Sequence, residues 1–212
     1  MPLTNRVETE EVLDLCPSGE IFACDFYLTD AETWAEKAWG FQLGRVTNVD
    51  HHAPVARMRQ HLSSTNLALL RVRQEGVVAA GSHIVLNHTD CDSVLSAAVL
   101  SGAVEPSDEL GVAAIAADHT GEPNAIADLL QAVDALRDYD LSQRNLRLLL
   151  EDKPLEPVAQ EALGSRHRKQ RSRRKLSRKA SSSDKMMYSL PNSMPLSTAN
   201  SLPRCCQMPP SS

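Results

Sequence analysis

The sequence predicts an α/β fold, in which a mostly parallel sheet is flanked by helices and followed by a disordered basic tail. Short apolar or β-branched segments alternate with helix-prone segments, and turn-forming residues separate them. The composition also changes abruptly after residue 164. We therefore expect a folded domain over residues 1–164 and a tail over residues 165–212. The chain is 42% hydrophobic, which is enough to build a core.

The first strand is predicted over residues 20–25, an apolar run that ends in an Asp. Residues 31–39 contain several Ala and Glu, follow a Thr-Asp pair that can cap a helix, and end at Gly40. This pattern predicts a helix. Residues 45–50 are β-branched and again end in an Asp, which predicts a second strand.

The second half of the domain begins at Ser63, which can cap a helix formed by the residues after it. Residues 82–87 predict a third strand, and residues 94–100 predict a helix of small side chains. The Ala-rich residues 111–117 form a further buried segment, which we expect to be helical. Residues 125–150 carry Leu, Ile and Val near helical spacing, which predicts one long helical stretch.

Charge is distributed unevenly between the two parts of the chain. Residues 1–164 contain 11 Lys and Arg against 26 Asp and Glu, whereas residues 165–212 contain 11 Lys and Arg against one acid, Asp184. The second part has no apolar period of a helix or strand, so we expect it to be disordered. Three origins stay open: an arm that binds RNA, DNA or acidic partners, the product of a shifted reading frame, or another linker or tail.

Several classes of protein are excluded by composition. No window approaches the run of about 18 apolar residues that crosses a membrane, and the acidic N-terminus lacks the apolar core of a secretory signal. The five Cys have no regular spacing, which argues against a disulfide framework and favours the reducing cytoplasm. Few aromatic residues argue against a nucleic-acid stacking platform.

Polar side chains follow the predicted strands, at the edge of the sheet where ligands bind in open α/β folds. Asp25 and Asp50 end the first two strands, and His88 follows the third in a His-x-Asp-x-Asp pattern with Asp90 and Asp92. Carboxylates and imidazoles are ligands of divalent cations, so this pattern predicts a cation site. An exposed polar turn with capping acids is the alternative interpretation.

Two adjacent histidines, His51 and His52, follow Asp50, and a further acid, Asp118, follows the segment at residues 111–117. The histidines offer nitrogen ligands, and Asp50 can bind an ion or orient an imidazole. A surface turn is the alternative for each short segment taken alone. The hypothesis of one shared site rests on all of them falling at segment ends of the same domain.

These residues also carry a family resemblance. The Asp-His-His triplet at residues 50–52 resembles the motif that names the DHH phosphoesterase superfamily, and the pattern that begins at His88 resembles its first motif. Asp25 and Asp118 resemble the second and fourth motifs, so the resemblance covers residues 20–125. Most of the family places the His-x-Asp-x-Asp motif first. Here it follows the triplet, so the chain resembles a rearranged, circularly permuted member.

The resemblance implies a hydrolase that uses two Mn²⁺ ions, with Mg²⁺ or Co²⁺ as alternatives, to activate a water against a phosphoester or phosphoanhydride. The implied substrate is a phosphate-containing small molecule or a short oligonucleotide. His52 would contact phosphate or an ion as a catalytic residue, and Asp50 would orient a histidine. The implied metal ligands are Asp25, His51, His88, Asp90, Asp92 and Asp118.

Other features limit or compete with this hypothesis. The family usually carries a second, substrate-selecting domain, and residues 165–212 have no pattern for one, so we expect an incomplete enzyme with weak activity. One alternative is a non-enzymatic nucleic-acid-binding protein that uses the basic tail, and another is a structural domain whose Asp and His are turn residues. The sequence is compatible with a homodimer. Candidates for phosphate contact, or else solvated surface charges, are Arg57, Arg59, Arg71 and Arg73.

Overall fold

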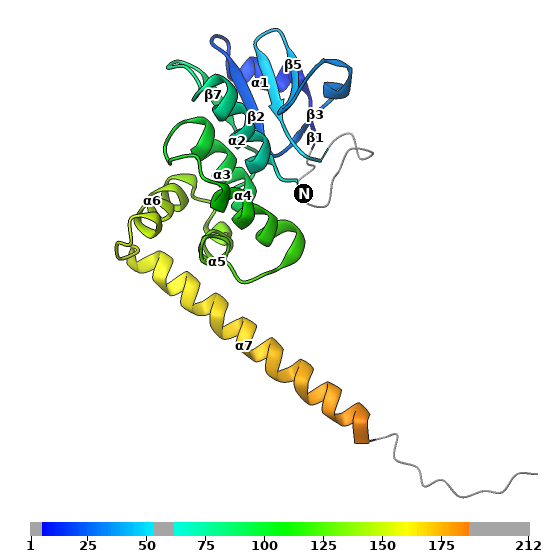
Figure 1. The fold of residues 1–212 in the computed structure, drawn as a ribbon, viewed down its shortest axis with the longest axis vertical. Coiled ribbons are helices and arrows are strands. Elements are labelled where there is room, and N and C mark those ends of the chain that lie inside the picture. The colour runs from blue at the N-terminus through cyan, green and yellow to red at the C-terminus, as the bar shows by residue number, and fades with distance from the viewer. Residues whose placement is uncertain (1–5, 53–61, 187–212) are drawn as a thin grey trace, which may run out of the picture. The chain divides into compact units, whose positions relative to one another are not determined.

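The computed structural model of the chain describes residues 6–52 and 62–186, and it divides into two compact units, residues 1–170 and 171–212. The first unit is α/β, which confirms the predicted fold class (Figure 1). The described part of the second unit is the C-terminal portion of one helix, α7 (Pro157–Met186). No helix of the described residues is both long and apolar enough to cross a membrane.

The main sheet has five strands in the order β4-β5-β6-β2-β7. The strands β6, β2 and β7 are parallel to one another, and β7 forms one edge of the sheet. Strand β5 runs antiparallel to β6, and β4 runs antiparallel to β5. A separate parallel pair joins β1 to β3. The strands are β1 (Arg6–Val7), β2 (Ile21–Cys24), β3 (Tyr27–Leu28), β4 (Ala35–Lys37), β5 (Gly40–Leu43), β6 (Val46–Val49) and β7 (His83–Val85).

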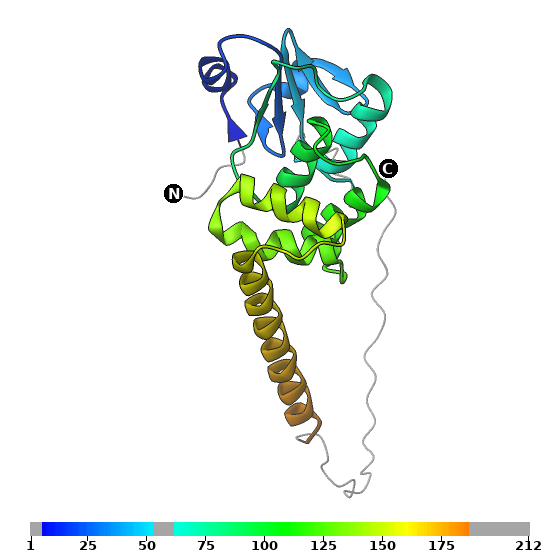
Figure 2. The same cartoon turned by 90° about the vertical axis from the view of Figure 1, so that its left-hand side faces the viewer.

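Helices cover the sheet and extend the first unit beyond it. In Figure 2 the dark-blue helix α1 lies on one side of the sheet and the green-cyan helix α2 on the other. The helix α3 packs along α2, and α4 to α6 pack around these two. The helices of this unit are α1 (Thr9–Leu15), α2 (Ser64–Glu75), α3 (Cys91–Leu100), α4 (Asp108–Ile115), α5 (Ala125–Val133), α6 (Tyr139–Leu150) and the start of α7.

The interior strand β2 is buried on both faces and separates two hydrophobic clusters. Ile21 and Ala23 belong to the cluster on the α1 side, together with Val12. Phe22 and Cys24 belong to the larger cluster formed with α2, α3, α4 and α5. Because side chains alternate along a strand, one continuous apolar run supplies both cores, as in sheets that are covered on both faces.

The helix predicted over residues 31–39 is wrong. The segment instead forms a single 3₁₀ turn, η1 (Ala31–Thr33), and the edge strand β4, which pairs with β5 in a hairpin. A Cβ at Gly40 would lie 2.0 Å from the Asn48 carbonyl oxygen, so only glycine allows this close strand approach. Pairing with β6 through β5 therefore outweighs the helical propensity of the Ala and Glu residues.

The long helical stretch predicted over residues 125–150 is divided. Helix α5 ends in a 3₁₀ turn, η4 (Asp134–Leu136), and Arg137 then adopts a left-handed backbone with φ of 51°. Asp138 caps α6 by accepting a hydrogen bond from the Leu141 N–H at 2.9 Å. The left-handed residue ends the first helix and the N-cap starts the second. The apolar period of the sequence continues across both helices.

The structure also differs from the expected start of the tail at residue 165. Helix α7 passes through Gly164 and continues to Met186. Residues 158–186 contain no proline and are rich in Arg and Lys, which are good helix formers even without an apolar face. The rest of the predicted tail, residues 187–212, lies outside the described residues.

Candidate metal centre

The three parallel strands bring the predicted polar groups to one edge of the sheet. Asp25 follows β2 directly, Asp50 follows β6 directly, and His88 lies three residues beyond the end of β7. Because β2 pairs with both β6 and β7 in parallel, the carboxyl ends of all three strands share this edge. Residues separated by up to 63 positions in the chain thus become neighbours.

The turn after β2 is held in a left-handed conformation at Asp25, whose φ is 62°. Its N–H donates to the Val49 carbonyl at 3.0 Å, which extends the pairing with β6. The buried Asn48 side chain donates to the carbonyls of Ala23 and Phe26, at 3.3 and 2.9 Å. Asp is among the few non-glycine residues that adopt this backbone readily, and Asn48 stabilises it from below.

The Asp25 carboxylate is buried and lies at the centre of the cluster. Its Oδ1 accepts from the Ser64 hydroxyl at 3.0 Å, and its Oδ2 accepts from the Ser93 hydroxyl at 2.8 Å. The same Oδ2 lies 3.1 Å from Nε2 of His88. Residues of α2, of α3 and of the loop after β7 therefore converge on one carboxylate.

The loop after β7 contributes His88 and Asp90. Nε2 of His88 lies 3.1 Å from Oδ2 of Asp90 as well, and its Nδ1 contacts the Asn87 side chain. Asp90 is the N-cap of α3 and accepts from the Ser93 N–H at 3.0 Å. Asp90 thereby satisfies a free N–H in the first turn of α3, which begins at Cys91.

Asp92 lies inside the first turn of α3 and is fully buried. Its Oδ2 accepts from the Ser64 N–H at 2.7 Å, and its Oδ1 accepts from the N–H and the hydroxyl of Thr65 at 2.7 and 2.6 Å. These are free N–H groups at the start of α2, where the helix dipole favours a negative charge. Asp92 therefore joins the N-termini of two helices at the site.

His51 is buried directly after Asp50, and burial lowers its pKa. Its Nε2 lies 3.6 Å from both Oδ1 of Asp25 and Oδ2 of Asp92. Within the described residues this buried nitrogen has no hydrogen-bond partner. A neutral imidazole nitrogen that faces two carboxylates without bonding to either is available as a ligand.

His52 is oriented by its neighbour in the triplet. Its Nδ1 lies 2.6 Å from Oδ1 of Asp50. This hydrogen bond is the largest influence on the imidazole and raises the pKa of His52 to about 9. The resemblance implied that Asp50 orients a histidine, and the geometry matches that arrangement.

Asp118 reaches the cluster from a π-helical turn, η3 (Ala116–Thr120), that ends α4. Such turns occur often at functional sites because they redirect side chains. The next residue, His119, places its ring edge-on to His51 with centroids 5.4 Å apart. Asp118 itself stays exposed to solvent at the rim of the site.

Three overlapping groups of side chains have ligand atoms within 4.8 Å of one another. Asp25 belongs to two of them and His51 to two, so the groups form one continuous cluster. All six metal ligands that the resemblance implied are included, and so is His52. The groups are Asp25 with His51 and His52, Asp25 with His88 and Asp90, and His51 with Asp92 and Asp118.

Two carboxylates of the cluster, those of Asp25 and Asp118, are hard to ionise in this surrounding. Burial, followed by the charge of Asp92, raises the pKa of Asp25 well above its usual range, and the hydrogen bond from His88 offsets only part of this. Desolvation of the Asp118 carboxyl, together with the charges of Asp92 and Asp90, raises its pKa to about 7. Both pKa values are raised, as expected for buried or closely spaced carboxyl groups without enough positive charge nearby.

Histidine protons supply part of that charge. Burial alone would lower the pKa of His88, but hydrogen bonds to Asp25 and Asp90 outweigh it and raise this pKa to about 10. Burial alone would raise the pKa of Asp90. The hydrogen bond from His88 and the charge of His88 outweigh burial and lower this pKa to about 2. The pair is therefore an imidazolium and a carboxylate at neutral pH.

The donor set fits divalent cations. Over residues 6–52 and 62–186, no Lys or Arg forms an ion pair with the acids of the cluster, whose ion-pair partners are all histidines. Ligand atoms bound to one ion at ~2.1 Å lie roughly 3 to 3.5 Å apart, close to the 3.6 Å distances from Nε2 of His51. The unpartnered His51 nitrogen and the buried acids are the groups that a cation would satisfy.

Several residues of the site have no counterpart in the sequence prediction. The Ser64, Thr65 and Ser93 hydroxyls were not expected to contact the carboxylates, and Arg137 was not expected near the site at all. Of the predicted phosphate contacts, Arg71 pairs with Glu75 and packs over the Phe22 ring, while Arg73 pairs with Asp108. Arg57 and Arg59 lie outside the described residues.

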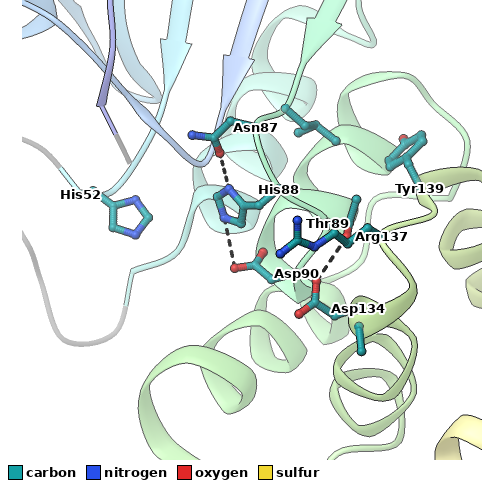
Figure 3. Close-up of a pocket in the computed structure, with 10 residues that line it drawn as sticks. His52, Asn87, His88, Thr89, Asp90, Asp134, Arg137 and Tyr139 are labelled. Carbon is teal, nitrogen blue, oxygen red and sulfur yellow. Dashed lines mark hydrogen bonds and ion pairs between the residues drawn. The ribbon is translucent and has the colours of Figure 1, made fainter. Parts of the chain in front are cut away.

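A pocket opens beside the cluster and shares three of its residues, His52, His88 and Asp90 (Figure 3). Its volume is about 790 Å³, which lies within the usual range for small-molecule sites. The opposite wall comes from η4 and the start of α6, including Asp134, Arg137 and Tyr139. The candidate ligands therefore line a space that can admit a substrate.

Comparisons with known proteins identify no relative of the chain. No protein-family model matches the chain, and neither the curated proteins nor the solved structures compared with it give a match. The fold and the cluster described above therefore carry the functional argument.

Proposed function

We propose that the protein is a metal-dependent phosphohydrolase of DHH type, which cleaves a phosphoester or phosphoanhydride with water. The observation that carries the proposal is the convergence of the Asp-His-His triplet, the His-x-Asp-x-Asp segment and two single acids on one cluster beside a pocket. These groups come from four segments that are far apart in the sequence. Ordinary turn residues would have no reason to meet at one point of the fold.

The residues that would hold the ions follow from the groups. His88 and Asp90 would bind one ion and His51, Asp92 and Asp118 a second, with Asp25 next to both. Oxygen and imidazole donors suit Mn²⁺, and Mg²⁺ or Co²⁺ are alternatives. When bound, two such ions supply Lewis acidity and lower the pKa of a water.

The protein's own residues would act on the substrate around this centre. Asp50 holds Nδ1 of His52, so the imidazole has a fixed orientation at the pocket wall. With its pKa raised to about 9, His52 carries a proton at neutral pH. It is therefore suited to bind a phosphoryl oxygen and to donate a proton to the leaving oxygen.

Two measurements on the full chain test the proposal. Thermal unfolding of metal-stripped protein is followed as Mn²⁺ is added, for wild type, for Asp90→Asn and for the control Asp108→Asn, an exposed acid whose partner is Arg73. Hydrolysis is then followed with bis(p-nitrophenyl) phosphate, inorganic pyrophosphate and a short oligoribonucleotide. Asp90→Asn is chosen because its amide oxygen can still accept the hydrogen bond that caps α3.

We expect Mn²⁺ to raise the melting temperature of wild type and of Asp108→Asn, and to raise that of Asp90→Asn much less. At least one of the three compounds should be hydrolysed only in the presence of metal, and the rate should fall strongly in Asp90→Asn. Absence of any Mn²⁺ effect on wild type would leave the cluster as a set of structural turn residues. A Mn²⁺ effect without hydrolysis of any probe would reduce the proposal to metal binding.

A further inference from the structure

The pocket beside the cluster has two chemically different sides. One side carries His52, His88 and Asp90, and the other carries Arg137 and Tyr139; Leu86 also lines the pocket. Figure 3 shows His52 on one side of the pocket and Tyr139 on the opposite side, with the Arg137 side chain pointing between them toward His88 and Asp90. A bare phosphate ion would fill only a small part of the 790 Å³ volume.

Among the described residues that line this pocket, Arg137 is the one Lys or Arg. Within the described ranges its guanidinium has no ion pair, whereas Arg73, Arg144 and Arg166 each pair with an acid. A cation without a carboxylate partner, exposed at a pocket that contains acids and histidines, is available to an oxyanion.

The backbone at Arg137 supports a role beyond packing. Its φ and ψ of 51° and 37° are left-handed, a conformation that residues with a Cβ rarely adopt and that glycine adopts freely. Two hydrogen bonds hold the turn. The Arg137 N–H donates to the Asp134 carbonyl at 2.9 Å, and the Thr89 hydroxyl donates to the Asp134 carboxylate at 3.2 Å. An arginine at a position that suits glycine is a reason to look for function.

Tyr139 and Leu86 give the pocket apolar surface. Both side chains are half-buried, so each presents part of its surface to the pocket. The Tyr139 hydroxyl accepts a hydrogen bond from the Gln143 side chain at 3.2 Å, which orients the phenol ring. An ordered aromatic ring is a surface on which an organic group, and a planar one in particular, can pack.

We propose that Arg137 and Tyr139 form the substrate-selecting wall of the site, so that the substrate is an organic phosphate of nucleotide type and not inorganic phosphate or pyrophosphate. Arg137 would bind phosphoryl oxygens that extend from the metal cluster, and Tyr139 with Leu86 would contact the organic group. This inference rests on the proposed function, because the cluster must first hold metal and phosphate.

The test compares a nucleotide with a bare anion on the Mn²⁺-loaded full chain. Binding of adenosine 5′-O-thiomonophosphate, which resists hydrolysis, and of inorganic phosphate is measured by calorimetry. The variants are Arg137→Gly, Arg137→Lys and Tyr139→Leu, with Arg168→Ala as a control that removes one exposed positive charge away from the pocket. Glycine tolerates the left-handed backbone, so Arg137→Gly should fold at least as well as wild type.

We expect wild type to bind the nucleotide more tightly than phosphate. Arg137→Gly should weaken nucleotide binding roughly 10- to 100-fold, and Arg137→Lys should weaken it less, because lysine keeps the charge but loses the planar fork. Tyr139→Leu should weaken nucleotide binding and leave phosphate binding unchanged. Arg168→Ala should resemble wild type.

The Mn²⁺-dependent rise in melting temperature is measured in parallel for every variant. If that rise is present and the nucleotide still binds no better than phosphate, or Arg137→Gly binds it as wild type does, the selecting wall is disproved and the metal site stands. If wild type shows no rise, the proposed function fails first, and the inference falls with it.

Discussion

Thr65 donates both its backbone N–H and its hydroxyl to the same oxygen of Asp92, at 2.7 and 2.6 Å. The two residues are 27 positions apart and belong to the first turns of α2 and α3, which form the most extensive helix contact of the fold. A carboxylate at the candidate metal centre therefore also holds two helices together.

Replacing Thr65 with Val removes the hydroxyl and keeps the shape of the side chain. One oxygen of a fully buried carboxylate loses a donor, so the free energy of unfolding should fall by about 1 to 3 kcal/mol. Urea unfolding of the metal-free protein measures this. The matched control is Thr33→Val, since the exposed Thr33 hydroxyl donates to the Asp30 carbonyl and its loss should cost less. Equal losses in the two variants would contradict a special role for the Thr65 hydroxyl.

Asp118→Asn should have opposite effects on the metal-free and metal-bound protein. The pKa of Asp118 is raised from 3.8 to about 7, so its ionisation opposes folding as pH rises through that interval. Removing the carboxyl should therefore stabilise the metal-free protein at pH 8 and have little effect near pH 3.8. The Mn²⁺-dependent rise in melting temperature should become smaller, because one candidate ligand is lost. Thermal unfolding at both pH values, with and without Mn²⁺, measures both effects, and a variant less stable than wild type at pH 8 without metal would refute the first.

Metal binding should release protons. The pKa of His88 is raised to about 10, so its imidazole is protonated at neutral pH and must lose a proton before Nε2 can bind an ion. The apparent Mn²⁺ affinity should therefore increase with pH between about 6 and 9. Calorimetry in buffers of different ionisation enthalpy counts the protons, and His88→Gln should release fewer. A binding enthalpy that is independent of the buffer would rule out His88 as a ligand.

His51→Leu should separate stability from metal binding. In the described residues Nε2 of His51 is buried without a hydrogen bond, so removing it should leave the metal-free protein as stable as wild type or more stable. The Mn²⁺ dissociation constant should rise at least about tenfold, by comparison with losses at supporting residues of metal sites. His83→Leu, a half-buried histidine on β7 outside the three groups, is the control and should leave Mn²⁺ affinity unchanged. Equal Mn²⁺ binding by the two variants would exclude His51 from the centre.

Local patterns were sufficient to predict the elements that form the framework of the site. The strand that ends before Asp25 is apolar over its whole length, and the strand that ends before Asp50 is β-branched except at Asn48; every residue of both strands is buried. The helix after Ser63 was predicted from its cap, and the capping box with Asn66 is present. Such signals are contained within a few consecutive residues, so no knowledge of the rest of the chain is needed.

The sequence by itself determined the α/β class and which residue types stand at the ends of the strands. Only the tertiary structure decided that Ala35 to Lys37 form a strand, because pairing with β5, which itself pairs with β6, overrides local propensity. It also decided that Asp92 binds the start of α2 and that Arg137 faces the pocket. The first of these relationships depends on how two helices pack across 28 residues of separation, and spacing along the chain does not encode that.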